Sequence, residues 1–223
     1  ILSHCNEAEW NKFQSENTNE AILDRIVKID VPYILELDQE VKIYEKMISR
    51  SDFTDRHIAP HTLKIASMFS VMSRLKPSQK CDILTKMKIY NGDEVIEKGR
   101  VKKIDIRDLR EETRHEGMTG ISTRFIMKSL DNALSDSDSN MITPVSVMDS
   151  LAKQVKEQIV QEDTREHYLE LIQIVIRDEY LKILENEIAK AFVTAYEEQA
   201  QSLFDTYLDN AEMHTTNGKV KDK

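Results

Sequence analysis

The sequence contains few residues that break helices: among its 223 residues there are 5 glycines and 4 prolines. Aromatic residues account for 6%, charged residues for 32% and hydrophobic residues for 40%. This composition is typical of a soluble, helix-rich protein, and the length suits one large domain or two small ones. A basic surplus is also absent. The formal net charge of −9 argues against a nucleic-acid partner, because binding a phosphate backbone needs a basic face.

Cysteine is scarce and long hydrophobic runs are missing. The two cysteines, Cys5 and Cys81, lie far apart with no pairing pattern, which favours reduced thiols in a cytoplasmic protein. No apolar run approaches the roughly 20 residues that a membrane helix needs, so we expect no membrane span. The chain opens on Ile-Leu-Ser without a leader pattern or a methionine, and we expect it to be a piece of a longer protein.

One pair of histidines has a spacing that suggests a metal site. His57 and His61 are four residues apart, as zinc ligands on one helix face would be. Pro60 stands between them, suits the first position of a helix, and places His57 before that helix. The two side chains therefore cannot share one helix face, and we expect no zinc site.

The polar run from 135 to 140 suggests calcium instead. Its acidic and amide residues match the first three ligand positions of an EF-hand loop. Met141 and Val147 stand where that loop requires Gly and Glu. The sequence thus predicts a solvated loop between helices and no metal ligand set.

The first 38 residues have an α/β pattern. Ile1–Cys5 reads as the end of a buried strand, a helix follows from Asn6, and Val27–Leu35 begins with strand-like alternation. Strand, helix and strand with short connections are typical of α/β units. Asn6 would then lie past the carboxyl end of a strand, where open α/β sheets bind their ligands.

From residue 39 to 142 the pattern is mainly helical. The stretch from Pro60 to Leu75 is apolar nearly all round, which predicts the buried helix of a small bundle. Asn91-Gly92 between two short apolar runs predicts a small hairpin. Asp105–Arg114 reads as a short charged helix.

The stretch Glu116–Leu130 combines a glycine loop with a helix start. Gly117 and Gly120 give a loop that can turn freely. Ser122 stands at the N-cap position of an amphipathic helix, so Arg124 falls in its first turn. An arginine held there presents a planar, permanently charged fork that suits phosphate or carboxylate. The alternative is an exposed first-turn arginine with no ligand.

Residues 143–223 are predicted to form a helical extension. Thr143-Pro144 is an N-cap and first-turn pair, and no Gly or Pro occurs between Val145 and Asn217. Apolar residues then follow a seam of roughly coiled-coil spacing, formed by Leu181, Leu184, Ile188, Phe192, Ala195, Leu203 and Tyr207. We expect these long helices to pack on one another or on a partner chain.

Five ordered segments resemble a known family: SHCNEAEW, AILDRIVKIDVPYIL, EVKIYEKMI, HIAPHTLKIASMF and EGMTGISTRF. They are similar to successive segments of the PrkA-type serine protein kinases, which carry an AAA+ ATPase module. The resemblance runs from residue 1 to about residue 210. It implies a mainly α fold: a remnant of the AAA+ α/β core in residues 1–38, a helical lid in 39–142 and a helical extension in 143–223.

The resemblance also implies roles for individual residues. Asn6 is similar to the sensor-1 residue that orients the water attacking the γ-phosphate, and Arg25 to the arginine finger that a ring presents to a neighbouring nucleotide. For Arg25 the alternative is an ion pair with Asp24 or Glu20.

Arg124 is similar to the sensor-2 arginine of the lid. Gly117, Gly120 and Ser122 are then expected beside it at the ATP site. An arginine can stabilise the charge on phosphoryl oxygens, which agrees with both arginine assignments.

Several motifs of phosphoryl transfer are missing from these 223 residues. We find no Gly-x4-Gly-Lys-[Ser/Thr] loop, no glycine-rich kinase loop, and no His-Arg-Asp or Asp-Phe-Gly motif. The resemblance implies that the intact protein uses ATP and Mg²⁺. It also implies that this chain begins downstream of the Walker motifs of that protein. It further implies a protein substrate phosphorylated on serine, a homo-oligomer, and an association with stress and sporulation. The alternatives are a remodelling or protease-type AAA+ motor and a helical interaction scaffold.

Overall fold

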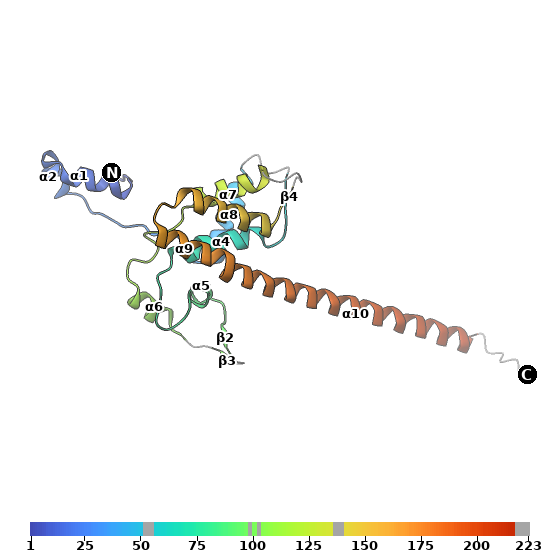
Figure 1. Cartoon of the computed structure of the whole chain (residues 1–223). Helices are drawn as coiled ribbons and strands as arrows, with labels where there is room; N and C mark the ends of the chain where they lie inside the picture. The colour runs from blue at the N-terminus through green and yellow to red at the C-terminus, as the bar shows by residue number, and fades with distance from the viewer. Residues whose placement is uncertain (51–55, 98–99, 102–103, 136–140, 217–223) are drawn as a thin grey trace, which may run out of the picture.

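A computed structural model of the chain describes residues 1–50, 56–97, 100–101, 104–135 and 141–216. The structure is mainly helical, which confirms the fold class expected from the sequence. Figure 1 shows an N-terminal segment with two small helices, a helical body, and a long helix that projects from the body toward the C-terminus. None of the helices in the described part of the chain combines the length and the hydropathy that crossing a bilayer requires.

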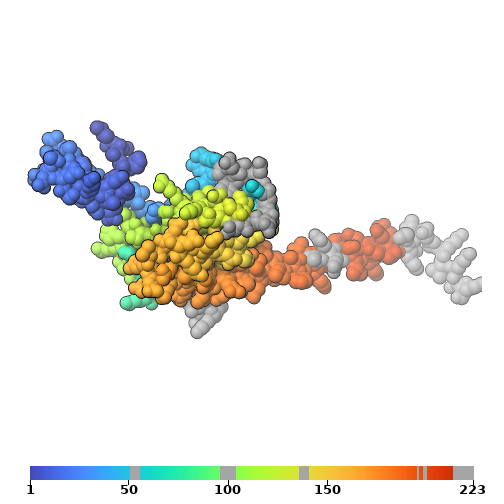
Figure 2. Space-filling view, turned by 45° about the horizontal axis from the view of Figure 1, so that its top comes forward, coloured from blue at the N-terminus to red at the C-terminus, as the bar shows by residue number. Residues whose placement is uncertain are grey.

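The N-terminal segment stands apart from the body and contains α1 (Glu7–Ser15), the 3₁₀ turn η1 (Asn17–Asn19) and α2 (Glu20–Leu23) (Figures 1 and 2). The strands expected at Ile1–Cys5 and from Val27 are not formed, and this expectation was wrong. Strand geometry needs a hydrogen-bonded neighbour. In the described residues no strand lies beside either segment, so the alternating residues Val27 and Val31 remain largely exposed.

The body is built around α4 (Thr62–Arg74), as the apolar run in this region predicts. Helix α4 packs against α3 (Leu37–Ile48), α7 (Thr123–Ser135) and α8 (Pro144–Gln158). Its buried side chains include Ile65, Ala66, Met68, Phe69, Val71 and Met72. Helix α4 begins two residues after Pro60, so this proline precedes the helix rather than starting it. Because α8 packs on α4 and α7, the core is continuous across residue 143, and the three-domain division stays a prediction.

A two-residue parallel ladder closes this bundle. Strand β1 (His57–Ile58) pairs with β4 (Met141–Ile142), so the segment before α4 lies beside the segment before α8. Thr143 then caps α8, with Pro144 in the first turn, as the sequence predicts. The EF-hand-like residues 136–140 lie outside the described residues.

A second group of elements is attached to the bundle through α5 (Ile83–Asn91), which packs against α3 and α4. Helix α6 (Ile106–Glu112) packs against α5. The antiparallel pair β2 (Ile96–Glu97) and β3 (Arg100–Val101) lies between α5 and α6 in the chain. The hairpin expected around Asn91-Gly92 was wrong by a few residues. Gly92 instead ends α5 with φ +83°, and its backbone N–H bonds back to the helix. The same Asn-Gly pair suits both a hairpin turn and a helix C-cap, because each needs a left-handed residue.

The last part of the chain is one nearly continuous helix. Helix α9 (Glu162–Glu170) passes through the π-helical turn η3 (Leu171–Ile176) into α10 (Arg177–Thr216). Leu171, Ile172 and Ile176 are buried in the body, and a salt bridge from Lys88 to Glu179 ties the start of α10 to α5. These buried residues precede the predicted seam, whose first residue, Leu181, is 48% exposed, so packing along the seam stays a prediction. From Ile188 onward α10 leaves the body and its apolar side chains are exposed (Figure 1).

Candidate functional site

The candidate site is the glycine loop before α7, which is held to α4 by backbone hydrogen bonds. The Gly117 N–H donates to the carbonyl oxygen of Arg74 at 3.3 Å, and the Ile121 N–H donates to Ser73 Oγ at 2.9 Å. On the other side, the Tyr33 N–H donates to the Gly117 carbonyl oxygen at 2.8 Å. The loop is thus bonded both to the end of α4 and to the extended chain that leads into α3.

Both glycines are required by this packing. Gly117 has φ +80° and Gly120 φ +113°, conformations that L side chains rarely adopt. A Cβ on Gly120 would lie 2.7 Å from the Ser73 carbonyl oxygen, and one on Gly117 would lie 3.0 Å from the Tyr33 carbonyl oxygen. The sequence led us to expect a freely turning loop. The structure shows that these glycines instead allow close contact with α4 and with the chain before α3.

A buried ion cluster holds Glu116, the residue that directly precedes Gly117 in the loop. The Lys86 ammonium contacts Glu116 Oε1 at 2.5 Å and also donates to Thr113 Oγ1 and to the Lys76 carbonyl oxygen. Tyr90 donates its hydroxyl to Glu116 Oε2 at 2.8 Å. Burial, together with this hydrogen bond and the carboxylate charge, raises the pKa of Tyr90. Every charged group in the cluster therefore has partners, which a buried charge requires.

A second buried ion cluster lies behind the loop. Arg74 Nη2 contacts Glu40 Oε1 at 2.8 Å, and both side chains are almost completely inaccessible. Tyr44 and Ser70 also donate to the same carboxylate oxygen. Burial alone would raise the pKa of Glu40, but the hydrogen bonds from Arg74 and Tyr44 outweigh it and hold the pKa below its usual value.

Arg74 also connects α4 directly to the neighbouring backbone. Its Nε donates to the Ile121 carbonyl oxygen at 3.1 Å, and its Nη1 donates to the Ile34 carbonyl oxygen at 2.9 Å. Its guanidinium lies over the Tyr33 ring, 4.6 Å from the centroid. The buried Arg74 side chain thereby bonds α4 both to the chain that leads from the N-terminal segment into α3 and to the loop before α7.

Arg124 projects from this frame at the start of α7. The Ser122 hydroxyl accepts a hydrogen bond from the Phe125 N–H at 3.3 Å, in agreement with its expected N-cap role. Arg124 lies in the first turn and is exposed. Within the part of the chain that the structure describes, its side chain makes no hydrogen bond or ion pair. A free guanidinium at a fixed position can accept a phosphate or carboxylate without first breaking an internal contact.

The other two predicted residues lie in the N-terminal segment and are not brought together with Arg124. The Asn6 Oδ1 accepts from the Glu9 N–H at 2.8 Å and so caps α1, and Glu9 Oε2 accepts in return from the Asn6 N–H. Arg25 follows α2 and is exposed. The alternative ion pair of Arg25 with Asp24 or Glu20 is not formed among the described residues. The roles assigned to Asn6 and Arg25 stay predictions.

Sequence reasoning missed the two ion clusters. A signal was present for Arg74, because it is a charged residue within a helix predicted to be apolar nearly all round. Lys86 offered a weaker signal beside Met87 on α5. Nothing in the local spacing of Glu40 or Glu116 indicated that they would be the partners, since these pairs join residues about thirty positions apart.

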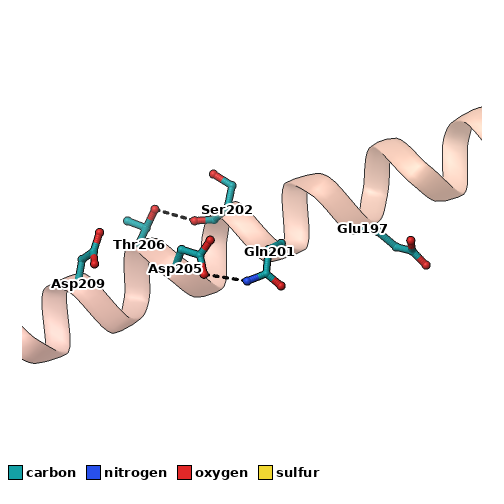
Figure 3. A pocket seen from close by; sticks show the side chains of 6 residues that line it. All are labelled: Glu197, Gln201, Ser202, Asp205, Thr206 and Asp209. Atoms are coloured by element: carbon teal, nitrogen blue, oxygen red, sulfur yellow. Dashed lines mark hydrogen bonds between the residues drawn. The ribbon is translucent and has the colours of Figure 1, made fainter.

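A surface hollow of about 600 Å³ lies on α10, far along the chain from Arg124, and is lined by Glu197, Gln201, Ser202, Asp205, Thr206 and Asp209 (Figure 3). These residues all belong to one helix, and both hydrogen bonds drawn between them run within it. Among the residues described, no group of three His, Cys, Asp or Glu side chains is placed to hold a metal ion.

Comparison with known family models shows both the class of domain that this chain contains and the family to which the chain belongs. Residues 1–82 match the PrkA AAA domain, so the chain includes part of an AAA-type domain. Residues 84–223 match the PrkA serine protein kinase C-terminal domain. The second match covers more than half of the sequence, and the chain therefore belongs to the PrkA family.

Two curated relatives are similar over the full length of this chain. One is the "ATP-dependent protease PrkA" of Bacillus subtilis (strain 168), 40% identical over 225 residues. The other is the "Serine/threonine kinase YeaG" of Escherichia coli (strain K12), 34% identical over 224 residues. Each match includes 100% of this chain but 35% of the relative, so the chain spans about a third of the length of either relative. No solved structure matches the chain.

Proposed function

We propose that this chain provides sensor and lid elements of the AAA+ ATPase module in a longer ATP-dependent serine/threonine protein kinase. The observation that carries the proposal is Arg124, an exposed arginine in the first turn of α7 that has no partner among the residues the structure describes. The loop before it is bonded to α4 and anchored by two buried ion clusters. The names of the family's C-terminal domain and of the Escherichia coli relative, which both describe a kinase, support the kinase assignment.

In this proposal Arg124 contacts a phosphate of ATP, with Gly117, Gly120 and Ser122 forming the frame that positions it. The charged fork can form two hydrogen bonds to phosphoryl oxygens and stabilise the charge that develops there. Asn6 would orient the attacking water, and Arg25 would contact the nucleotide of a neighbouring subunit in a homo-oligomer. The Asn6 amide oxygen already caps α1, which leaves its amide N–H₂ group for this role.

Mg²⁺ is assigned to the intact protein rather than to these residues. The described side chains supply a guanidinium suited to phosphate, but no group of three His, Cys, Asp or Glu side chains placed to hold a metal ion. A Walker-type loop and metal-binding acid would have to come from sequence beyond these 223 residues. We further propose a cytoplasmic protein that phosphorylates serine in a protein substrate and functions in stress or sporulation responses.

The test is substitution of Arg124 in the full-length protein. Arg124→Ala should lower ATP affinity or turnover by about tenfold or more, because a charged bidentate contact contributes about 1.5–3 kcal/mol. Arg124→Lys should restore the activity only in part, since it keeps the charge but loses the fork. Lys128→Ala is the matched control, because Lys128 is also exposed on α7, one turn further on. Equal losses for Arg124→Ala and Lys128→Ala would contradict the proposed role of Arg124.

A second candidate is an AAA+ remodelling or protease-type motor without kinase activity. The observation that favours it is the similarity to the Bacillus subtilis relative, which is named an ATP-dependent protease. Both candidates use ATP, so they are separated by the product. Transfer of labelled γ-phosphate to serine in a protein substrate supports the kinase. ATP-dependent cleavage or unfolding of a protein without such transfer supports the motor.

A further inference from the structure

The distal part of α10 carries an apolar face that nothing in the described structure covers. Phe192 is 73% exposed, Tyr196 72% and Tyr207 68%, while Phe204 is 57% exposed. Figures 1 and 2 both show this part of the helix extending away from the body. Exposed large apolar side chains that lie together on one surface indicate an interface. We therefore asked which partner the sequence of this arm, residues 188–211, would fit.

The apolar residues of the arm are arranged symmetrically about Ala200. Phe192 and Leu208 lie eight residues to either side, Val193 and Tyr207 seven, and Tyr196 and Phe204 four. Ala189 and Ala211 lie eleven residues to either side. Two helices related by a two-fold axis at Ala200 would bring each of these residues opposite its symmetric counterpart. Such self-complementarity is what a two-fold interface between identical chains requires. Ile188 and Leu203 are the exceptions, with Glu212 and Glu197 at their symmetric positions.

One acidic residue borders the apolar face and bears on the orientation of the pair. At about 100° per residue, Glu197 lies about 60° round the helix from Ala200, whereas Glu198, Asp205, Asp209 and Glu212 lie about 120° or more away, outside the interface. A parallel pair in register would place Glu197 beside its own copy. An antiparallel pair gives it Leu203 as its symmetric counterpart instead. Like charges side by side are unfavourable, so Glu197 favours the antiparallel arrangement.

We propose that residues 188–211 of α10 pair in antiparallel orientation with the same residues of a second copy of this chain, about a two-fold axis at Ala200. The small side chain of Ala200 allows close approach at the axis. Covering the four aromatic side chains of each copy removes on the order of 1,000 Å² of surface from water over both chains, which is the lower limit of size for a specific interface. This arm pairing is independent of the proposed function, because it involves no residue of the Arg124 site.

The first test is the molar mass of the chain by sedimentation equilibrium at micromolar concentration. The unmodified chain should be a dimer. The double variant Phe192→Glu with Phe204→Glu should raise the dissociation constant by about 100-fold or more, because it places charges in the centre of the interface. The matched control is Thr194→Glu with Ser202→Glu, which adds the same charge to the polar side of the same helix and should leave the dimer intact. Helical content by circular dichroism should be equal in all three proteins.

The second test measures orientation with spin labels in a background carrying Cys5→Ser and Cys81→Ser. Labels on Lys190→Cys and Gln201→Cys lie eleven residues apart on one stripe of the helix, at the edge of the apolar face and about 80–100° round the helix from Ala200. In the antiparallel pair the two labels at 201 are offset along the helix by about 3 Å and those at 190 by about 30 Å, given a rise of 1.5 Å per residue. The label distance at 190 should therefore be much the longer. In a parallel pair the two distances would be equal.

Three outcomes would overturn the arm pairing. A monomeric unmodified chain at these concentrations would show that the face does not bind a second copy. Dimers that survive Phe192→Glu with Phe204→Glu would place the interface elsewhere. Equal label distances at 190 and 201 would exclude the antiparallel arrangement.

Discussion

The helical body of this protein buries charged side chains, whereas the arm exposes apolar ones. In the body, Arg74, Glu40 and Lys86 are buried within hydrogen-bonded clusters. In the arm, Phe192 and Tyr196 are exposed to solvent. Both placements are costly for an isolated side chain, since charges lose hydration when buried and apolar groups order water when exposed.

The difference shows what each region already contains. The Arg74 guanidinium donates hydrogen bonds to four acceptors within the body: Glu40 Oε1, Ser70 Oγ and the carbonyl oxygens of Ile34 and Ile121. The aromatic side chains of the arm have no such complement within the described residues. The charged groups around the glycine loop find their partners within the body, whereas the aromatic side chains of the arm are exposed in the described structure.

The largest expected effect comes from breaking a buried ion cluster. Arg74→Met should lower the free energy of unfolding by about 3–5 kcal/mol, because Glu40 would remain buried without its main partner. Chemical denaturation followed by circular dichroism measures this loss. Adding Glu40→Met should recover part of it, since the unpaired charge is then removed. A double variant as unstable as Arg74→Met alone would show that the backbone contacts of Arg74, and not the charge pair, dominate.

The next effect concerns the glycine loop. Gly120→Ala should lower the free energy of unfolding by about 2–4 kcal/mol, because the added Cβ meets the backbone of Ser73 and Arg74 and the positive φ is unfavourable. Gly92→Ala is the control: Gly92 also has a positive φ, but a Cβ there meets no atom within 4 Å. It should cost only the conformational strain of about 1–2 kcal/mol. Equal losses in thermal or denaturant unfolding would mean that the loop is not packed on α4.

A smaller effect should appear in the pH dependence of stability. The folded pKa of Glu40 is held below its ordinary value of 4.5, so its contribution is fully present above that pH and is lost as the pH falls through the folded pKa. Glu40→Gln should be less stable than the unmodified chain by about 1–3 kcal/mol at neutral pH. This gap should close in acid, as measured by urea unfolding over a pH series. A gap that stays constant with pH would contradict the ionised state of Glu40.

The smallest effect is expected in the arm. Phe192→Ala should change the unfolding free energy of the dilute monomer by no more than about 0.5 kcal/mol, because an exposed side chain contributes little to the fold. Measurement at low concentration keeps association from adding to the result. A loss comparable to that of Gly120→Ala would mean that the arm folds back onto the body in solution.

The helical body was predictable because its signals are local. The apolar run that became α4, the Thr143-Pro144 start of α8 and the Ser122 cap of α7 each depend on a few adjacent residues. Position and exposure of Arg124 followed from the same local pattern. Its proposed contact with ATP is a prediction that these local patterns do not test.

The features that the sequence analysis missed or predicted wrongly have a common physical origin: they depend on residues that lie far apart in the sequence. Val27 and Val31 alternate as a strand does, but a strand forms only beside another strand. The Glu40–Arg74 and Lys86–Glu116 pairs depend on how the helices pack, which single-sequence periodicity does not encode. The glycine loop was expected to be free because its sequence shows the conformational range of glycine but not the neighbours that fill the space around it.

The π-helical turn η3 takes up one residue more than an α-helical turn does, because its hydrogen bonds close at i→i+5 instead of i→i+4. The extra residue is accommodated within Leu171–Ile176, where Leu171, Ile172 and Ile176 are buried. Removing one residue from this segment would let it continue as an ordinary α-helix, with Phe192 and Tyr196 still facing the same side. A deletion in the regular part of α10 before Phe192 would instead rotate both aromatic residues by about 100° relative to the body. The π-helical turn therefore allows the chain length to change inside the buried core without changing the direction in which the arm presents its aromatic residues.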